Sequence, residues 1–188
     1  MRGGAGRGDR FAQEFPRIPQ VLFETGEPRL QCEKAISHMA AAALVPSPRV
    51  DPRHACFQLS IRQSRIHCRG VYAEESIPAR HKVIEYTGER IGRRETLRRG
   101  QGLVTYLFTL DNYWTIDGSV GGSGAEIINH SCDPNLCAWI FKGHILYMSK
   151  RDIERGEELS VDYRFSKKVE LVRCRCGAAN CRGTINLP

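Results

Sequence analysis

Three cysteines crowd together near the C-terminus of this chain: Cys174, Cys176 and Cys181. In an extended segment, residues i and i+2 face the same side, so Cys174 and Cys176 can present two thiols to one point. Gly177 permits the turn that returns Cys181 to that point. Such clustering favours zinc, but three thiolates leave a tetrahedral ion one ligand short. We predict a closed, structural site completed by Cys132; the alternative is three unrelated thiols.

Two polar runs could carry chemistry, although neither decides the matter alone. The run Asn129–Asn135 (Asn-His-Ser-Cys-Asp-Pro-Asn) is a polar loop with a turn at Asp-Pro. A lone histidine in such a loop is more often structural than functional. The run Glu157–Tyr163 follows a turn at Arg155-Gly156. A tyrosine that ends a strand either packs or supplies a catalytic hydroxyl, and by itself Tyr163 favours packing.

The elements that position these residues are expected to be short strands. From Cys56 onward, runs rich in β-branched and aromatic residues alternate with glycine, proline and aspartate, which favours a mainly β domain. One helix is expected around Arg93–Arg99. Residues 1–55 form an extension, partly disordered, in which residues 33–44 have high helix propensity. The candidate strands are Phe57–Ile61, Val83–Tyr86, Thr105–Leu110, Trp139–Phe141, Ile145–Met148 and Leu159–Tyr163.

Composition and charge limit the class of protein. The chain has 188 residues, of which 41% are hydrophobic, which suits one domain with an extension. No segment has the roughly 20 apolar residues that span a bilayer, and the N-terminus lacks the apolar core of a secretory signal. We therefore expect an intracellular protein that makes no membrane contact.

The net charge of +7 fits either solubility or contact with polyanions. Arginines cluster at Arg93–Arg99 without aromatic residues between them, so only weak nucleic-acid contact is expected.

Taken together and in this order, the motifs of residues 57–187 resemble the SET-domain methyltransferases. Asn129–Asn135 resembles the family's Asn-His-Ser-Cys-x-Pro-Asn motif, and Glu158–Tyr163 resembles its Glu-Leu-x-x-Asp-Tyr motif. Cys174-x-Cys176-x4-Cys181 resembles the post-SET zinc element. The likeness is closest to trithorax-type proteins and to small stand-alone SET proteins, some of them bacterial. Further matches are Tyr86-Thr87-Gly88, Tyr106-Leu107-Phe108 and Ile116-Asp117.

The resemblance implies a fold, a division of the chain and an activity. The fold is that of a SET domain: short curved sheets, few short helices and a threaded C-terminal segment. The divisions are the extension 1–55, the SET domain 56–165 and the post-SET zinc segment 166–188. The activity is transfer of methyl groups from S-adenosylmethionine to a lysine amine of a protein. The substrate would be a histone tail or another basic, nucleic-acid-associated protein, in the cytoplasm of a bacterium or the nucleus of a eukaryote.

The resemblance also assigns roles to individual residues. Tyr163 becomes the catalytic tyrosine, whose hydroxyl orients the amine, and Tyr106 lines the lysine channel beside the methyl group. Ile185 or Leu187 would pack near the adenine. The expected cofactor contacts are Arg69, Gly70, Asn129 and His130, the channel residues are Phe108 and Val161, and the ligands of one structural zinc are Cys132, Cys174, Cys176 and Cys181.

The reaction itself sets requirements. A lysine amine has a pKa near about 10.4, and it must lose its proton before it attacks. Desolvation and a nearby positive charge both lower that pKa, so an apolar, aromatic channel is needed.

The residue two positions before the catalytic tyrosine borders the methyl-accepting end of the channel in the family. Val161 cannot hold a water there, which predicts a di- or trimethyl product; the alternative is that Val161 is strand packing and Phe108 narrows the channel.

Two departures from the family pattern keep alternatives open. The Gly-x-Gly cofactor motif appears here as Cys68-Arg69-Gly70, and a side chain at Cys68 could crowd the cofactor. The family's Arg-Phe before Asn-His is replaced by Glu126-Ile127. The alternatives are a catalytically weak SET-fold binding module, or a basic zinc protein that binds nucleic acid. The retained Tyr106 and Tyr163 argue against the latter.

Overall fold

The structure is a computed structural model that describes residues 48–102, 104–167 and 170–188. The helical stretch expected at residues 33–44 lies outside these ranges. The described residues consist mainly of short strands with one short α-helix, so the predicted fold class is confirmed. The strands are β1 (Leu59–Gln63), β2 (Arg69–Ala73), β3 (Lys82–Tyr86), β4 (Glu89–Gly92), β5 (Leu107–Thr109), β6 (Trp114–Asp117), β7 (Asn129–His130), β8 (Leu136–Phe141), β9 (His144–Ser149) and β10 (Ser160–Val161).

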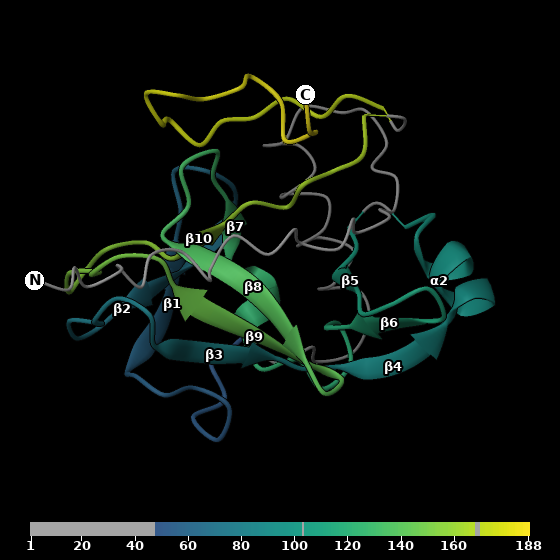
Figure 1. Cartoon of the computed structure of the whole chain (residues 1–188), viewed down its shortest axis with the longest axis horizontal. Helices are drawn as coiled ribbons and strands as arrows, with labels where there is room; N and C mark the ends of the chain where they lie inside the picture. The colour runs from purple at the N-terminus through teal and green to yellow at the C-terminus, as the bar shows by residue number, and fades with distance from the viewer. Residues whose placement is uncertain (1–47, 103, 168–169) are drawn as a thin grey trace, which may run out of the picture.

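Within the described ranges, the strands form four small sheets (Figure 1). Two have three strands, in the orders β3-β9-β8 and β4-β6-β5, and two have two strands, β1-β2 and β10-β7. Every pair is antiparallel except β7 with β10, which run parallel. A parallel pair requires a long connection. The chain between β7 and β10 supplies one, because it contains the whole β8–β9 hairpin.

The helix α2 (Arg93–Arg99) has the predicted bounds. Gly92 is its N-terminal cap, Glu95 lies in its first turn, and Arg98 and Arg99 lie in its last turn, which suits the helix dipole. Its anchor is the Arg99 guanidinium, which binds the buried carboxylate of Asp117 on β6 at 2.6 Å. This ion pair fixes the helix to the β4-β6-β5 sheet.

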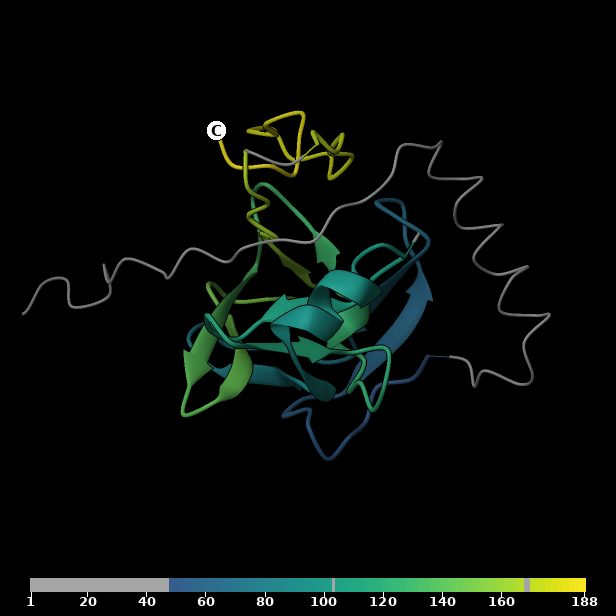
Figure 2. The same ribbon diagram turned by 90° about the vertical axis from the view of Figure 1, so that its right-hand side faces the viewer.

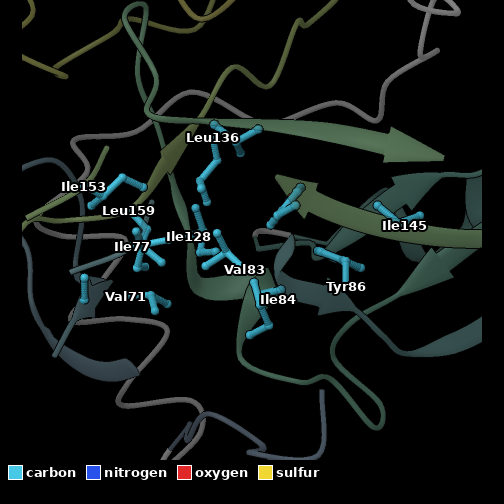
Figure 3. Close-up of a cluster of buried hydrophobic side chains, with 14 of the residues drawn as sticks. Val71, Ile77, Val83, Ile84, Tyr86, Ile128, Leu136, Ile145, Ile153 and Leu159 are labelled. Atoms are coloured by element: carbon cyan, nitrogen blue, oxygen red, sulfur yellow. The ribbon is translucent and has the colours of Figure 1, made fainter. Parts of the chain in front are cut away.

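The hydrophobic core lies where the strand faces meet (Figure 3). Its members alternate along the strands with more exposed residues, as in β9, where Ile145 and Tyr147 are buried. Each fully buried isoleucine or leucine contributes about 1.5–3 kcal/mol. The core residues drawn and labelled are Val71, Ile77, Val83, Ile84, Tyr86, Ile128, Leu136, Ile145, Ile153 and Leu159.

The strand β10 is inserted between earlier strands. On one side, Leu159, the residue before β10, donates its backbone N–H to Val71 O on β2 at 2.7 Å. On the other side, Ser160 and Val161 pair with β7. The buried amide of Asn135 locks the insertion, because its Oδ1 accepts Ser160 N at 2.9 Å and its Nδ2 donates to Glu158 O at 2.9 Å. The two polar runs of the sequence thus become neighbours.

The last described segment, residues 170–188, lies to one side of the sheets, at the top of both views (Figures 1 and 2). It forms a second, small apolar cluster around Phe165, Cys174 and Ile185. The side chain of Asn186 is fully buried and donates to Ser166 O at 3.0 Å and to Glu170 O at 3.1 Å. No helix within the described ranges is long and apolar enough to cross a membrane.

Candidate functional site

The four cysteines predicted to bind zinc lie together. Their sulfur atoms are all within 4.8 Å of one another. Cys132 Sγ lies 3.7 Å from Cys174 Sγ and 3.9 Å from Cys181 Sγ. Two thiolates bound to one tetrahedral zinc are separated by about 3.8 Å, because each Zn–S bond is about 2.3 Å long. The cluster therefore fits a four-thiolate ion, with Cys176 as its remaining member.

Tyr163 lies just beyond the end of β10, beside this cluster. Its hydroxyl donates to Ile128 O at 2.9 Å. Its ring stacks on Phe165 with centroids 5.8 Å apart and lies 5.5 Å from the His130 ring. Burial raises the pKa of Tyr163 well above its ordinary value, and Tyr106 raises it further. The hydroxyl therefore stays protonated and acts as a hydrogen-bonding group rather than as a base.

Tyr106 is joined through its backbone to a group of aromatic side chains. Its backbone oxygen accepts hydrogen bonds from Tyr86 Oη at 2.5 Å and from Gly118 N at 2.8 Å. Phe108 lies 5.4 Å from the Tyr86 ring and 6.3 Å from the Tyr147 ring. Burial raises the pKa of Tyr106, and so does the nearby carboxylate of Glu126. The rings of Tyr86, Phe108 and Tyr147 thus form an aromatic group that is joined to Tyr106 through its backbone oxygen.

The predicted channel residue Val161 is 4% exposed and is part of the main core. It pairs with His130 across the β7–β10 ladder. Ile185 is also buried, within the small cluster next to Phe165 and Cys174, and Leu187 N donates to Phe165 O at 2.7 Å. The C-terminal segment thus ends close to the stack formed by Tyr163 and Phe165.

Two of the predicted cofactor residues, Gly70 and Asn129, lie against the carboxylate of Glu158, to which the sequence interpretation gave no role. Asn129 Nδ2 lies 2.9 Å from Arg69 O and 2.9 Å from Glu158 Oε1. A Cβ atom added to Gly70 would lie 2.2 Å from Glu158 Oε1. Glu158 also accepts hydrogen bonds from Ser64 Oγ at 2.8 Å and from Tyr72 Oη at 2.9 Å. A side chain at position 70 would therefore displace this carboxylate from its hydrogen bonds.

His130 connects the cofactor residues to Tyr163. Its Nδ1 accepts a hydrogen bond from Tyr163 N at 3.1 Å, so its ring proton is assigned to Nε2. Burial lowers the pKa of His130, which keeps the imidazole neutral. The Asp162 carboxylate lies 3.4 Å from the same Nδ1. Position and tautomer of His130 are thus set by the residues that end β10.

The sequence interpretation also missed the ion pair between Asp162 and Arg182. Arg182 Nη1 lies 3.0 Å from Asp162 Oδ2, and Nη2 lies 2.9 Å from Oδ1. Such a two-point contact fixes both groups in one plane. The available signal was that Asp162 precedes Tyr163 in a family motif and that Arg182 follows Cys181.

Both departures from the family pattern have structural consequences. Cys68 has a φ of 40°, in the left-handed region that glycine adopts most easily. A cysteine there costs about 1 kcal/mol. Glu126 is half-buried, which raises its pKa, and its Oε2 accepts Gly124 N at 2.8 Å. A Cβ atom on Gly118 would lie 2.7 Å from Glu126 Cβ, so the glycine-rich loop closes over this side chain.

Comparison with known proteins gives consistent matches. The family described as the SET domain matches residues 68–164. A histone-lysine N-methyltransferase of Schizosaccharomyces pombe, H3 lysine-4 specific, is 40% identical over 139 residues, which are 69% of this chain and 15% of that protein. The histone-lysine N-methyltransferase trithorax of Drosophila virilis is 36% identical over 137 residues, 68% of this chain and 4% of that protein. The chain thus spans 15% or less of these relatives.

One solved structure extends the likeness to three dimensions. It is the crystal structure of KRYPTONITE in complex with mCHG DNA and SAH, which has a TM-score of 0.60 and 29% sequence identity. The match covers 70% of this chain and 29% of that one.

Proposed function

This chain belongs to the SET-domain family, and we propose that it transfers methyl groups from S-adenosylmethionine to a lysine side chain of a protein. The observation that carries the proposal is the meeting of the two polar runs. The β7–β10 pairing places Asn129 beside Ser160 and His130 beside Val161, and Tyr163 N donates a hydrogen bond to His130. The similar solved structure contains SAH, the demethylated form of this cofactor.

The residues of this chain would bind, align and desolvate the reacting groups. When bound, the cofactor supplies an electrophilic methyl group on a positively charged sulfur. The region around Arg69, Gly70 and Asn129 would hold it, and the aromatic group at Tyr106 would enclose the lysine. Removal of water favours the neutral amine. The protonated Tyr163 hydroxyl can accept a hydrogen bond and orient that amine towards the methyl group.

We also infer a structural zinc ion. The four thiols fit a tetrahedral ion in spacing and number. They would use every ligand position, so the ion would hold residues 174–181 against β7 and take no part in the chemistry. Residues 166–188 would then form the post-SET segment, residues 56–165 the SET domain, and residues 1–55 an extension.

The proposed substrate is a histone tail. The relatives that match over most of this chain are named histone-lysine methyltransferases, several of them H3 lysine-4 specific. Histone tails are in the nucleus of a eukaryote, where this chain would act. Val161 carries no hydroxyl, and we propose a di- or trimethyl product.

We further propose weak contact with nucleic acid through the surface around α2. The sequence showed no aromatic residue among the arginines of α2, but folding brings one to a neighbouring arginine: β6 pairs with β4, so that Arg90 Cζ lies 4.5 Å from the centre of the Trp114 ring. Trp114 is 39% exposed and Tyr113 is 72% exposed. Exposed rings stack on bases at about 1–3 kcal/mol per base. Trp114→Ala should weaken salt-dependent binding of a DNA oligonucleotide, whereas Phe141→Ala, an exposed ring on another sheet, should not.

A methylation assay tests the central proposal. The protein would be incubated with labelled S-adenosylmethionine and a histone H3 tail peptide, and the product identified by mass spectrometry. We expect methylation of a lysine. Binding of S-adenosylhomocysteine without any methyl transfer to histones or other lysate proteins would instead support a catalytically weak binding module.

A further inference from the structure

We propose that Arg182 is a positioning residue that couples metal binding to assembly of the methyl-transfer site. This inference rests on the proposed zinc and methyl-transfer functions. In outline, the closed cysteine cluster holds the ends of the two parallel strands β7 and β10. It holds β7 through the ligand Cys132, and it holds β10 through Arg182 and Asp162.

The first connection runs along the chain. Cys132 lies two residues after His130, which ends β7. Cys132 N donates to Cys176 Sγ at 3.4 Å, and Cys132 Sγ accepts Arg182 N at 3.4 Å. A metal bound by the cluster therefore fixes the position of Asn129 and His130, the predicted cofactor contacts.

The second connection runs through a side chain. Cys181 belongs to the cluster, and the next residue is Arg182. The guanidinium of Arg182 makes two hydrogen bonds to Asp162, which directly follows β10. Asp162 Oδ1 also accepts Arg164 N at 3.1 Å. The carboxylate thus braces the backbone on both sides of Tyr163, the predicted catalytic residue.

The environment of Arg182 indicates that this contact is specific. Its side chain is only 23% exposed, as is that of Asp162. Arg182 Nε is buried and makes no hydrogen bond within the described residues, which a solvated surface arginine would avoid by turning outward. The guanidinium is therefore held in the position that binds Asp162, although this leaves its Nε–H donor without a partner. Arg175, in the same segment, is exposed and provides a matched comparison.

Thermodynamic linkage gives the inference a readout independent of turnover. If zinc and cofactor both favour the closed arrangement, each must strengthen binding of the other by the same factor. At equilibrium, the parent protein should therefore retain zinc against a higher concentration of chelator when S-adenosylhomocysteine saturates it. Without the contact between Arg182 and Asp162, the cluster no longer holds β10. The protection of zinc against the chelator by S-adenosylhomocysteine should then largely disappear.

The test compares the parent with Arg182→Ala, Arg182→Lys and Arg175→Ala. We expect Arg182→Ala to retain one zinc per chain, to lose the protection by S-adenosylhomocysteine, and to lose kcat/KM on the order of 100-fold through misplacement of Tyr163. Arg182→Lys, which keeps the charge but not the two-point contact, should recover part of both. Arg175→Ala should behave as the parent.

Two results would overturn the inference. One is an Arg182→Ala protein with the parent's zinc protection and kcat/KM. The other is loss of zinc from both Arg182 variants, which would make Arg182 a part of the metal site alone. A parent protein that binds no zinc or transfers no methyl group would instead refute the proposed function, and that measurement comes first.

Discussion

Replacement of Tyr163 by phenylalanine removes one hydroxyl from the centre of the proposed site. In the structure this hydroxyl donates to Ile128 O at 2.9 Å. Loss of one such hydrogen bond costs about 1 kcal/mol of stability, which lowers the melting temperature of a domain of this size by about 3–4 °C. Proteins of this kind are stable by about 5–15 kcal/mol. The variant therefore stays folded, and unfolding cannot explain a loss of activity.

The effect on turnover should be much larger. A positioned hydrogen-bonding group that acts on a transition state is worth about 100- to 1,000-fold in kcat. We therefore expect Tyr163→Phe to lose at least about 100-fold in kcat, or about 2.7 kcal/mol of transition-state stabilisation. S-Adenosylhomocysteine affinity should change little, because the residues expected to hold the cofactor remain in place.

The matched control is Tyr86→Phe, since Tyr86 also donates its hydroxyl to a backbone oxygen, that of Tyr106. Both variants should lose similar stability in a thermal melt, but only Tyr163→Phe should lose most of its turnover in a mass-spectrometric methylation assay. Equal, small losses of activity in the two variants would show that Tyr163 is a packing residue and that the mechanism is wrong.

Three further outcomes follow from the site. Cys176→Ser should lose zinc and activity together, which metal analysis and the methylation assay would measure; a fully active metal-free parent would contradict this. Gly70→Ala should destabilise the fold and weaken S-adenosylhomocysteine binding, because the added Cβ meets Glu158 Oε1 at 2.2 Å. The added Cβ of Gly92→Ala meets nothing closer than 4.0 Å, so this variant should lose only the small stability difference between glycine and alanine at a helix cap and should keep its S-adenosylhomocysteine binding in thermal-shift measurements. The parent should accumulate di- or trimethyl-lysine in a time course, and Val161→Tyr should shift the product towards monomethyl; exclusive monomethylation by the parent at long times would refute the role of Val161.

Local sequence determined much of the fold and several candidate residues. A helix was expected around Arg93–Arg99, and the structure shows that the groups which favour it lie within the same segment: the cap Gly92, the early Glu95 and the late Arg98 and Arg99. The cysteine cluster was predicted for a similar reason, since three of its thiols lie within one short segment. Cys132 was chosen as the fourth ligand because three thiolates leave a tetrahedral ion one ligand short, and the structure brings it to the other three.

Strand lengths were less accessible to sequence interpretation. The candidate strand Thr105–Leu110 shrinks to Leu107–Thr109, and Leu159–Tyr163 shrinks to Ser160–Val161. The residues at their ends hydrogen-bond elsewhere: Leu159 binds Val71, and Tyr106 accepts from Gly118. A β-propensity pattern cannot show which partner a backbone group will find.

Only the tertiary structure decided which side chains act together across the chain. Arg182 and Asp162 are 20 residues apart in sequence, and Arg90 meets Trp114 only because β4 pairs with β6. Residue types and their spacing can predict a contact between residues that lie within one or two turns of each other in the chain. Contacts between distant segments depend on strand order and on how β10 inserts beside β7, and those are set by burial of the whole core rather than by any local motif.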